Sequence, residues 1–217
     1  MEFAGPIAKL PLSDEVFQNL KQATIGQNHA ESLAGVLEDQ YLVNYKECPE
    51  FVNFIKAQSL EYLQIRHNDL IFHHIVNSFR NDKWNNNKAE FDVTKHFDLT
   101  IDRIWLNSGT NSSYSPLHIH SGLFSFIVYV SIPYTFEEEC KLTPDIEEDK
   151  VLNGCTEFVD NFFYSSIKVA VDKSTEGTCF LFPAWVPHMV YPFKSKGRRI
   201  TIAGNLYLTT KNEKVKT

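Results

Sequence analysis

The stretch Ser115–Val130, SPLHIHSGLFSFIVYV, places two histidines at the start of an apolar run of β-forming residues. His118 and His120 stand at i and i+2, and such residues project to the same face of an extended strand. Both imidazoles can therefore reach a single metal ion. A lone buried histidine is usually a hydrogen-bonded core residue, but a same-face pair meets the requirement for ligation. The pair predicts one edge of a metal site on a β-rich scaffold.

The rest of the chain after residue 97 has the same character. Short runs rich in Val, Ile, Phe, Tyr and Thr are interrupted by Gly, Pro, Asn and Ser, a pattern typical of a sandwich or a barrel. The acidic segment 136–150 has no period and is predicted to be an exposed insertion. The predicted strands are LTIDRIWLN (99–107), FSFIVYVSI (124–132), TEFVD (156–160), IKVAVD (167–172), TCFLFP (178–183), HMVYP (188–192) and RRITIAGNLYL (198–208).

The first part of the chain has a helical period. From Ser13 to about Phe79, apolar residues recur at spacings of three and four, AESLAGVLEDQYLV (30–43) included. Ser13 is a candidate N-cap, and the polar, Asn-rich segment 81–91 is a predicted loop. We therefore expect an α+β protein with one domain over residues 1–217. Residues 1–90 would form mainly helical support and residues 91–210 the β core.

Composition excludes several classes of protein. The chain has 217 residues, is 43% hydrophobic and 22% charged, and carries a formal net charge of −6. This is the composition of a globular domain with no basic face or tail, so we expect neither nucleic-acid nor membrane binding. No secretory signal and no run of about 20 apolar residues is present. The four cysteines form no CxxC pair, which predicts reduced thiols in a cytoplasmic protein.

A third metal ligand must come from elsewhere in the β half. The best candidate is His188, in GTCFLFPAWVPHMVYPF (177–193), where it opens a short predicted strand. Imidazole suits Fe(II), Zn, Cu or Ni, and three ligands on one face leave positions open for a substrate. No role is assigned to the remaining histidines, which are His29, His67, His73, His74 and His96.

The strand after His188 carries a candidate anion clamp. Strand alternation puts Arg199, Thr201 and Ala203 on one face. Arginine supplies a bidentate fork and threonine a hydroxyl donor, which together suit a carboxylate. The alternative is that Arg198 and Arg199 are both simply exposed to solvent.

In combination these motifs resemble the small 2-oxoglutarate/Fe(II)-dependent oxygenases, above all the prolyl-hydroxylase-like members of bacteria and their phages. The resemblance covers about residues 98–208. It rests on the order of Trp105-Leu106-Asn107, His118-Ile119-His120-Ser121-Gly122, Gly177 to Pro183, His188, and Arg199-Ile200-Thr201 with Asn205.

The resemblance implies a double-stranded β-helix (jelly-roll) that holds Fe(II) and uses 2-oxoglutarate and O2. His118 and His188 would be metal ligands, and Arg199 with Thr201 would bind the cosubstrate carboxylate. Tyr129 would add a hydrogen bond. Asn107 would line the site, or else serve as a turn residue at a strand end. The expected reaction hydroxylates an unidentified substrate and releases succinate and CO2. The location would be the cytoplasm, or the host cytoplasm for a phage-encoded protein.

One position departs from the family pattern. The widespread facial triad has two histidines and one carboxylate, and His120 stands where Asp or Glu is expected. Asp102 is the nearest acid and lies on an earlier predicted strand. The same-face spacing favours His120 as the third ligand over an arrangement in which water completes the coordination. A neutral imidazole there raises the net charge of the site by one unit.

Two other classes of protein are compatible with the same strands. A non-catalytic, cupin-like metal-binding jelly-roll would use the three histidines, but cupins generally add a Glu soon after HxH, and the first acid after His120 is Glu137. A structural jelly-roll protein would need no metal.

Overall fold

The computed structural model describes residues 1–24, 37, 39–66, 95, 97–160 and 165–211. Two antiparallel sheets form the core of this part of the chain. The strands are β1 (Glu2–Ala4), β2 (Ile7–Pro11), β3 (Asp39–Val43), β4 (Phe97–Gly109), β5 (Ser115–His118), β6 (Phe124–Ser131), β7 (Thr156–Asp160), β8 (Ser165–Val169), β9 (Thr178–Pro183), β10 (His188–Val190) and β11 (Arg199–Thr210). The α-helices are α1 (Asp14–Gln22), α2 (Pro49–Arg66) and α5 (Phe136–Lys141), and the 3-10 helices are η1 (Tyr45–Glu47), η3 (Glu148–Lys150) and η4 (Lys173–Thr175).

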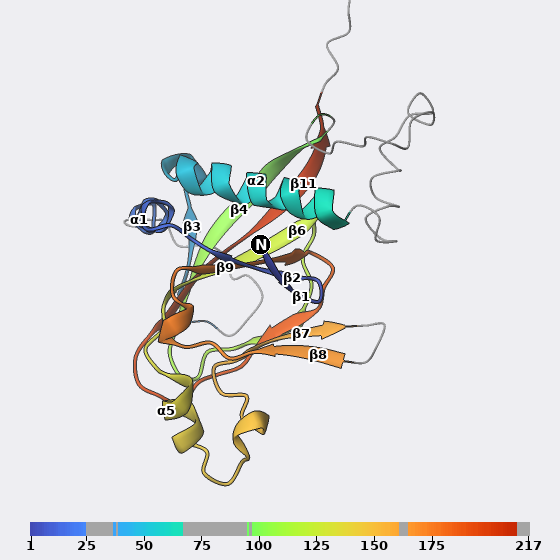
Figure 1. The fold of residues 1–217 in the computed structure, drawn as a ribbon. Coiled ribbons are helices and arrows are strands. Elements are labelled where there is room, and N and C mark those ends of the chain that lie inside the picture. Colours follow the sequence, from blue (N-terminus) through green and yellow to red (C-terminus); the bar gives the residue numbers. More distant parts are fainter. Residues whose placement is uncertain (25–36, 38, 67–94, 96, 161–164, 212–217) are drawn as a thin grey trace, which may run out of the picture.

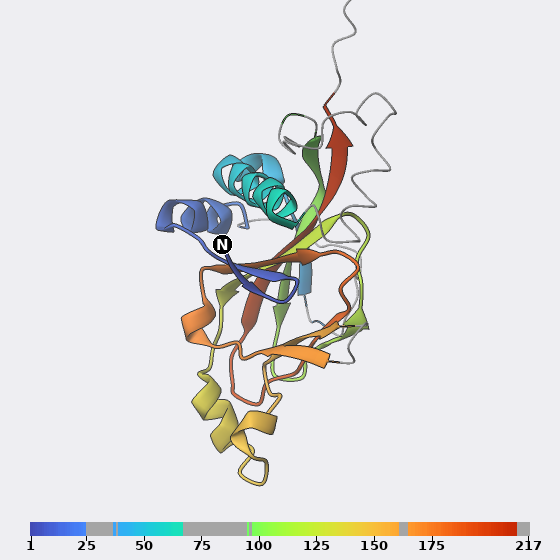
Figure 2. The ribbon, with the colours of Figure 1, turned by 45° about the vertical axis from the view of Figure 1, so that its right-hand side comes forward.

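The larger sheet has seven strands in the order β1-β2-β9-β6-β11-β4-β3, and the smaller has four in the order β5-β10-β7-β8. Helices α1 and α2 lie on one side of the large sheet, and β7 and β8 lie on its other side (Figures 1 and 2). The architecture confirms the predicted double-stranded β-helix with a helical layer. The predicted strands of the β half are confirmed as well.

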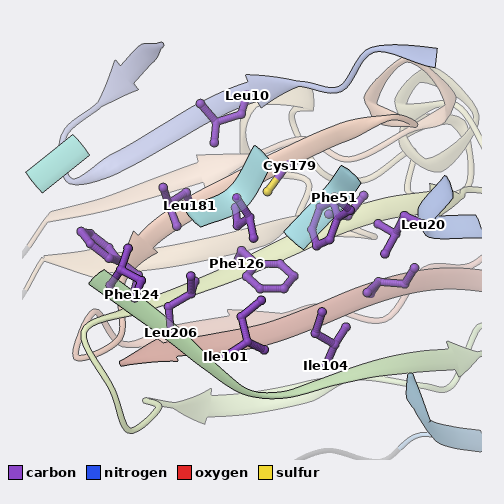
Figure 3. Packing of buried hydrophobic residues seen from close by; sticks show 14 of the residues in the cluster. Leu10, Leu20, Phe51, Ile101, Ile104, Phe124, Phe126, Cys179, Leu181 and Leu206 are labelled. Atoms are coloured by element: carbon purple, nitrogen blue, oxygen red, sulfur yellow. The ribbon is translucent and has the colours of Figure 1, made fainter. Parts of the chain in front are cut away.

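The helical layer packs on the large sheet through an apolar cluster. Helix α1 begins after Ser13, whose Oγ accepts a hydrogen bond from Val16 N at 3.3 Å, as expected of an N-cap. Phe51 of α2 is fully buried, and its ring packs edge-on against Phe126 of β6, with centroids 5.3 Å apart. Figure 3 shows these rings among the aliphatic side chains of both layers. This burial of apolar surface fixes the helices on the sheet.

A second apolar cluster fills the space between the two sheets. Tyr129 of β6, Phe180 and Phe182 of β9, and Phe158 of β7 all belong to it. The Phe158 and Phe182 rings meet edge-on, with centroids 4.9 Å apart. This cluster sets the spacing of the sheets beside the histidine strands, because Phe182 and Phe158 also touch the ring of His188.

The helical prediction that begins at Ser13 is wrong in one place. Segment 39–43, expected in a helix, is β3, and it pairs with β4. It adds to an open edge of the large sheet, so backbone hydrogen bonding to a neighbouring strand outweighs the local helical period there. Residues 2–4 and 7–11, which precede the predicted helical part, form β1 and β2, and β2 pairs with β9. Segment 81–91 and the five histidines without an assigned role lie outside the described residues.

The acidic segment forms α5 and η3 at one end of the molecule (Figure 1). Most of its side chains are exposed, as expected, but Glu139 is fully buried. The Glu139 carboxylate accepts hydrogen bonds from the backbone N of Lys194 at 2.7 Å and of Ser195 at 2.9 Å. Segment 136–150 is therefore tied to the turn that leads into β11. Within the described residues, none of the helices has the length and apolar character needed to span a bilayer.

The neighbouring strands β6 and β4 leave no space for a side chain at Gly204 of β11. A Cβ atom there would lie 2.5 Å from the Phe126 ring and 3.0 Å from the Arg103 carbonyl. We expect Gly204→Val to destabilise the protein by about 3 kcal/mol or more in denaturant unfolding, because overpacking a close-packed core forces strain on its neighbours. Ser166→Ala, on the exposed surface of β8, should change stability by less than about 0.5 kcal/mol. Equal stability of the two variants would contradict this account of the core.

Candidate functional site

A cavity of about 350 Å³ lies between the two sheets. The large sheet contributes residues of β4, β6, β9 and β11, and the small sheet contributes residues of β5 and β10. The lining includes Asp102, Arg103, Trp105, Asn107, His118, His120, Phe182, His188, Val190, Arg199, Thr201 and Asn205. A volume of this size is that of a small-molecule site.

Three histidines meet on one side of the cavity. The ligand nitrogens of His118, His120 and His188 lie within 4.8 Å of one another. His118 and His188 are directly opposed in the β5–β10 pair, and their ring centroids are 4.3 Å apart. His120 does not lie on the same strand as His118, as the sequence predicted, because β5 ends at His118. It reaches the cluster from the connection to β6, where its backbone N donates to the Ala184 carbonyl at 2.8 Å.

Backbone carbonyls orient two of the rings. His118 Nδ1 lies 2.7 Å from the Pro116 carbonyl, and His188 Nδ1 lies 3.0 Å from the Val186 carbonyl. A carbonyl oxygen can only accept, so each Nδ1 carries the proton and donates. The Nε2 atom of each ring is then unprotonated and offers its lone pair, which is the arrangement of metal-binding histidines.

The environment keeps the rings of His188 and His120 neutral. Burial, together with the neighbouring His118, lowers the pKa of His188 to about 3. Burial and His118 likewise lower the pKa of His120 to about 4. Desolvation disfavours the charged imidazolium, so at pH 7 both rings are neutral and available as ligands.

No carboxylate joins the cluster among the residues that the structure describes. Asp102 does line the same cavity, but its Oδ2 lies 3.2 Å from Nε of Arg103, and both side chains are about half exposed. The candidate metal site therefore consists of three imidazole nitrogen donors, and the position of His120 is the one at which the family pattern has an acid.

Arg199 lies in another part of the cavity wall and is 6% exposed. Its Nη1 donates to Tyr134 Oη at 3.3 Å, to the Gly154 carbonyl at 3.4 Å and to the Tyr191 carbonyl at 3.2 Å. These acceptors are all neutral. Within the described ranges no Asp or Glu forms an ion pair with Arg199. A buried cation without a counter-charge is costly, so this wall of the cavity favours an anion.

Thr201 and Asn107 extend the polar wall next to Arg199. They are direct partners in the β11–β4 pair, and Asn107 Nδ2 lies 3.5 Å from Thr201 Oγ1. Tyr129 is the partner of Thr201 on β6, but it is not among the residues that line the cavity. Its buried hydroxyl is hydrogen-bonded to Thr156 Oγ1 at 2.7 Å. Tyr129 thus lies behind the wall, in contrast to the expected contact with a cosubstrate.

The structure brings together every other site residue that the sequence indicated. What the sequence did not indicate is the set of groups that support them. Tyr134, Gly154 and Tyr191 hold Arg199, and Gln40 holds Asn107. These residues are far from the motifs along the chain, and only sheet pairing and loop packing bring them near.

Comparison with known proteins agrees with this geometry. The family described as "Putative 2OG-Fe(II) oxygenase" matches residues 103–205. This segment contains all three histidines of the cluster and both residues of the anion clamp. No curated protein matches the chain.

Several solved structures share the fold. An oxidoreductase of the 2OG-Fe(II) oxygenase family from Burkholderia pseudomallei is 10% identical, with a TM-score of 0.53 over 93% of this chain and 84% of that one. A prolyl-4-hydroxylase from Pseudomonas putida is also 10% identical, with a TM-score of 0.53 over 93% and 92%. SnoN, a non-heme alpha-ketoglutarate-dependent epimerase of nogalamycin biosynthesis, is 12% identical, with a TM-score of 0.52 over 97% and 82%. At these identities the likeness establishes the fold.

The lowered histidine pKa values predict that the metal-free protein loses stability in acid. Between about pH 4 and 6.5 the unfolded chain binds protons at His120 and His188 that the folded chain does not, so stability rises with pH over this interval. Each imidazole contributes up to about 1.4 kcal/mol per pH unit. Denaturant unfolding at pH 5 and pH 7 with a chelator present should show a smaller pH dependence for His188→Gln than for the parent. An unchanged dependence would contradict the burial of a neutral ring.

Proposed function

We propose that the chain is an Fe(II)- and 2-oxoglutarate-dependent dioxygenase that hydroxylates a substrate still to be identified, and the match of residues 103–205 to the family described as "Putative 2OG-Fe(II) oxygenase" supports this. The observation that carries the proposal is one cavity with two matched parts. Three imidazoles converge on one side of it, and its wall holds a buried arginine that forms no ion pair with the described carboxylates.

His118, His120 and His188 would hold the iron. The fit rests on the donor set itself, because the nitrogens converge within 4.8 Å and carbonyl contacts leave Nε2 of His118 and His188 free to ligate. Imidazole is a suitable ligand for ferrous iron, and three protein ligands leave positions for a cosubstrate and O2. His120 in place of a carboxylate makes the proposed centre one charge unit more positive than the usual triad.

Arg199 and Thr201 would bind the distal carboxylate of 2-oxoglutarate. The guanidinium has three neutral oxygens around Nη1 that orient it, while its charge is unpaired among the described residues. A carboxylate would supply the missing charge and accept a hydrogen bond from the Thr201 hydroxyl. Asn107 and Asn205 line the wall beside Thr201 and add polar groups to this part of the cavity.

Bound iron and 2-oxoglutarate would supply the oxidative chemistry, in which the cosubstrate and O2 give succinate, CO2 and one oxygen atom for the substrate. The protein would contribute orientation and a water-poor environment. Phe182 and Val190 give the cavity wall its apolar parts, and Trp105 lies with its ring centroid 5.8 Å from that of His120. Asp102, Arg103 and Ser121, which also line the cavity and are partly exposed, would meet the substrate on its way in.

Turnover of 2-oxoglutarate tests the cosubstrate site. Purified protein with Fe(II), ascorbate and O2 should form succinate, which NMR detects directly. Arg199→Ala should reduce this turnover at least about a hundredfold, because the cosubstrate loses its charged partner in a buried site. Arg198→Ala is the matched control, since that neighbouring side chain is about half exposed and pairs with Asp39. Equal loss in both variants, or none in Arg199→Ala, would reject the assignment.

Metal affinity tests the histidines independently of turnover. Calorimetric titration with Co(II) under nitrogen should give one site per chain. His118→Ala and His188→Ala should each weaken binding by more than tenfold, and His120→Ala should do the same if that ring is a ligand. His120→Asp should retain tight binding, because a carboxylate is also a competent donor. Parent-like affinity of His120→Ala would show that His120 does not bind the metal.

A further inference from the structure

We infer that Gln40 is a positioning residue for the cosubstrate, and that it acts by setting the direction of a hydrogen-bond chain that ends at the Thr201 hydroxyl. The inference rests on the proposed function, because it assumes that Thr201 meets a carboxylate. Gln40 lies on β3, in the part of the chain where the sequence predicted a helix, and it is 5% exposed. It is not among the residues that line the cavity.

Sheet register places the members of this chain side by side. Gln40 of β3 is the partner of Asn107 of β4, Asn107 is the partner of Thr201 of β11, and Thr201 is the partner of Tyr129 of β6. The four side chains therefore form one row across the large sheet, on the face that turns toward the small sheet. Only the middle two, Asn107 and Thr201, reach the cavity wall.

The hydrogen bonds within the row have a fixed direction. Gln40 Nε2 donates to Asn107 Oδ1 at 2.8 Å, so the Asn107 amide turns its Nδ2 away from Gln40. Asn107 Nδ2 then lies 3.5 Å from Thr201 Oγ1 and donates to it. Because Thr201 Oγ1 accepts this bond, its own hydrogen is free to be donated elsewhere. No protein acceptor takes that hydrogen among the described residues.

The direction matters because Arg199 and Thr201 share one face of β11. A carboxylate has two oxygens, and the guanidinium and the hydroxyl can each donate to one of them. If Asn107 were reversed, its Oδ1 would face Thr201 and would accept the hydroxyl hydrogen. The Thr201 oxygen lone pairs would then face the carboxylate, which is repulsive. Gln40 disfavours this reversed state because its Nε2 would then face the Asn107 Nδ2, another donor, in place of the oxygen to which it donates at 2.8 Å.

The test compares two ligands on two variants of Gln40. Gln40→Glu is close in size but can only accept, so it should reverse the Asn107 amide. Gln40→Met keeps the volume and removes the polar group, so Asn107 loses its orienting partner. Ligand affinities are measured by calorimetry on Co(II)-loaded protein under nitrogen. The ligands are 2-oxoglutarate and 2-oxobutyrate, which has the same 2-oxo acid end but no second carboxylate.

We expect Gln40→Glu to weaken 2-oxoglutarate binding about tenfold and Gln40→Met to weaken it about threefold, which is the range for one ordinary hydrogen bond. Affinity for 2-oxobutyrate should change less than twofold in both. In a Thr201→Val background, Gln40→Glu should have no further effect on the affinity for 2-oxoglutarate, because the hydrogen-bond chain then lacks the hydroxyl that donates to the ligand. Leu42→Ala, at an exposed position of the same strand, is the control and should leave both affinities unchanged.

The outcomes separate this inference from the proposed function. Parent protein that takes up Co(II) but binds neither 2-oxo acid overturns both. A second outcome overturns the inference alone. In it, the parent protein binds 2-oxoglutarate, but the Gln40 variants lose affinity for 2-oxoglutarate and 2-oxobutyrate equally, because a general distortion of the sheet would have that effect. Persistence of the Gln40→Glu effect in the Thr201→Val background also overturns it. A thermal unfolding scan of each Co(II)-loaded variant identifies any that lost the fold. If Gln40→Glu does not fold, the comparison of the two ligands is made on Gln40→Met.

Discussion

The alternation of side chains along one central strand organises this protein. Strand β11 is hydrogen-bonded on both sides, to β6 and to β4, so its register is fixed from two directions. Arg199, Thr201 and Ala203 consequently face the cavity, while Ile202 and Leu206 face the helical layer and belong to its apolar cluster. A shift of one residue would exchange these two sets. The same pairing that builds the core thus places a cation in the interior.

Holding that cation has a cost that the fold meets only in part. Neutral oxygens around the guanidinium replace water, and the Phe193 ring lies 5.3 Å from its centre. These contacts orient Arg199 without neutralising it. The histidine cluster differs, since burial keeps the rings of His120 and His188 uncharged. A metal bound by the histidines and an anion bound by Arg199 would each also stabilise the fold.

The sequence was informative where local pattern and chemistry coincide. Same-face spacing identified His118 and His120, and alternation identified Arg199 with Thr201, because both follow from the period of a strand. It failed for segment 39–43, whose apolar spacing also suits a helix, because the decisive partner is β4, more than fifty residues later. For Tyr129 the resemblance implied a hydrogen bond to the cosubstrate, but its hydroxyl is hydrogen-bonded to Thr156 Oγ1 of the small sheet, a contact that no motif along the chain indicates. The supports of Arg199 come from loops and were not accessible to periodicity at all.

The N-terminal strands have a consequence for where the chain can be divided. β2 covers one edge of the sheet along β9, and β3 covers the opposite edge along β4. A fragment that began at residue 91 would contain every residue proposed to bind the metal or the cosubstrate. Both edges of its main sheet, however, would present unpaired backbone amides and carbonyls to solvent. The face covered by Phe51 and Leu20 would also be bare. Such a fragment would expose two unpaired strand edges and would be prone to aggregate by strand addition. The first 66 residues therefore protect the β core from aggregation by covering these edges and this face.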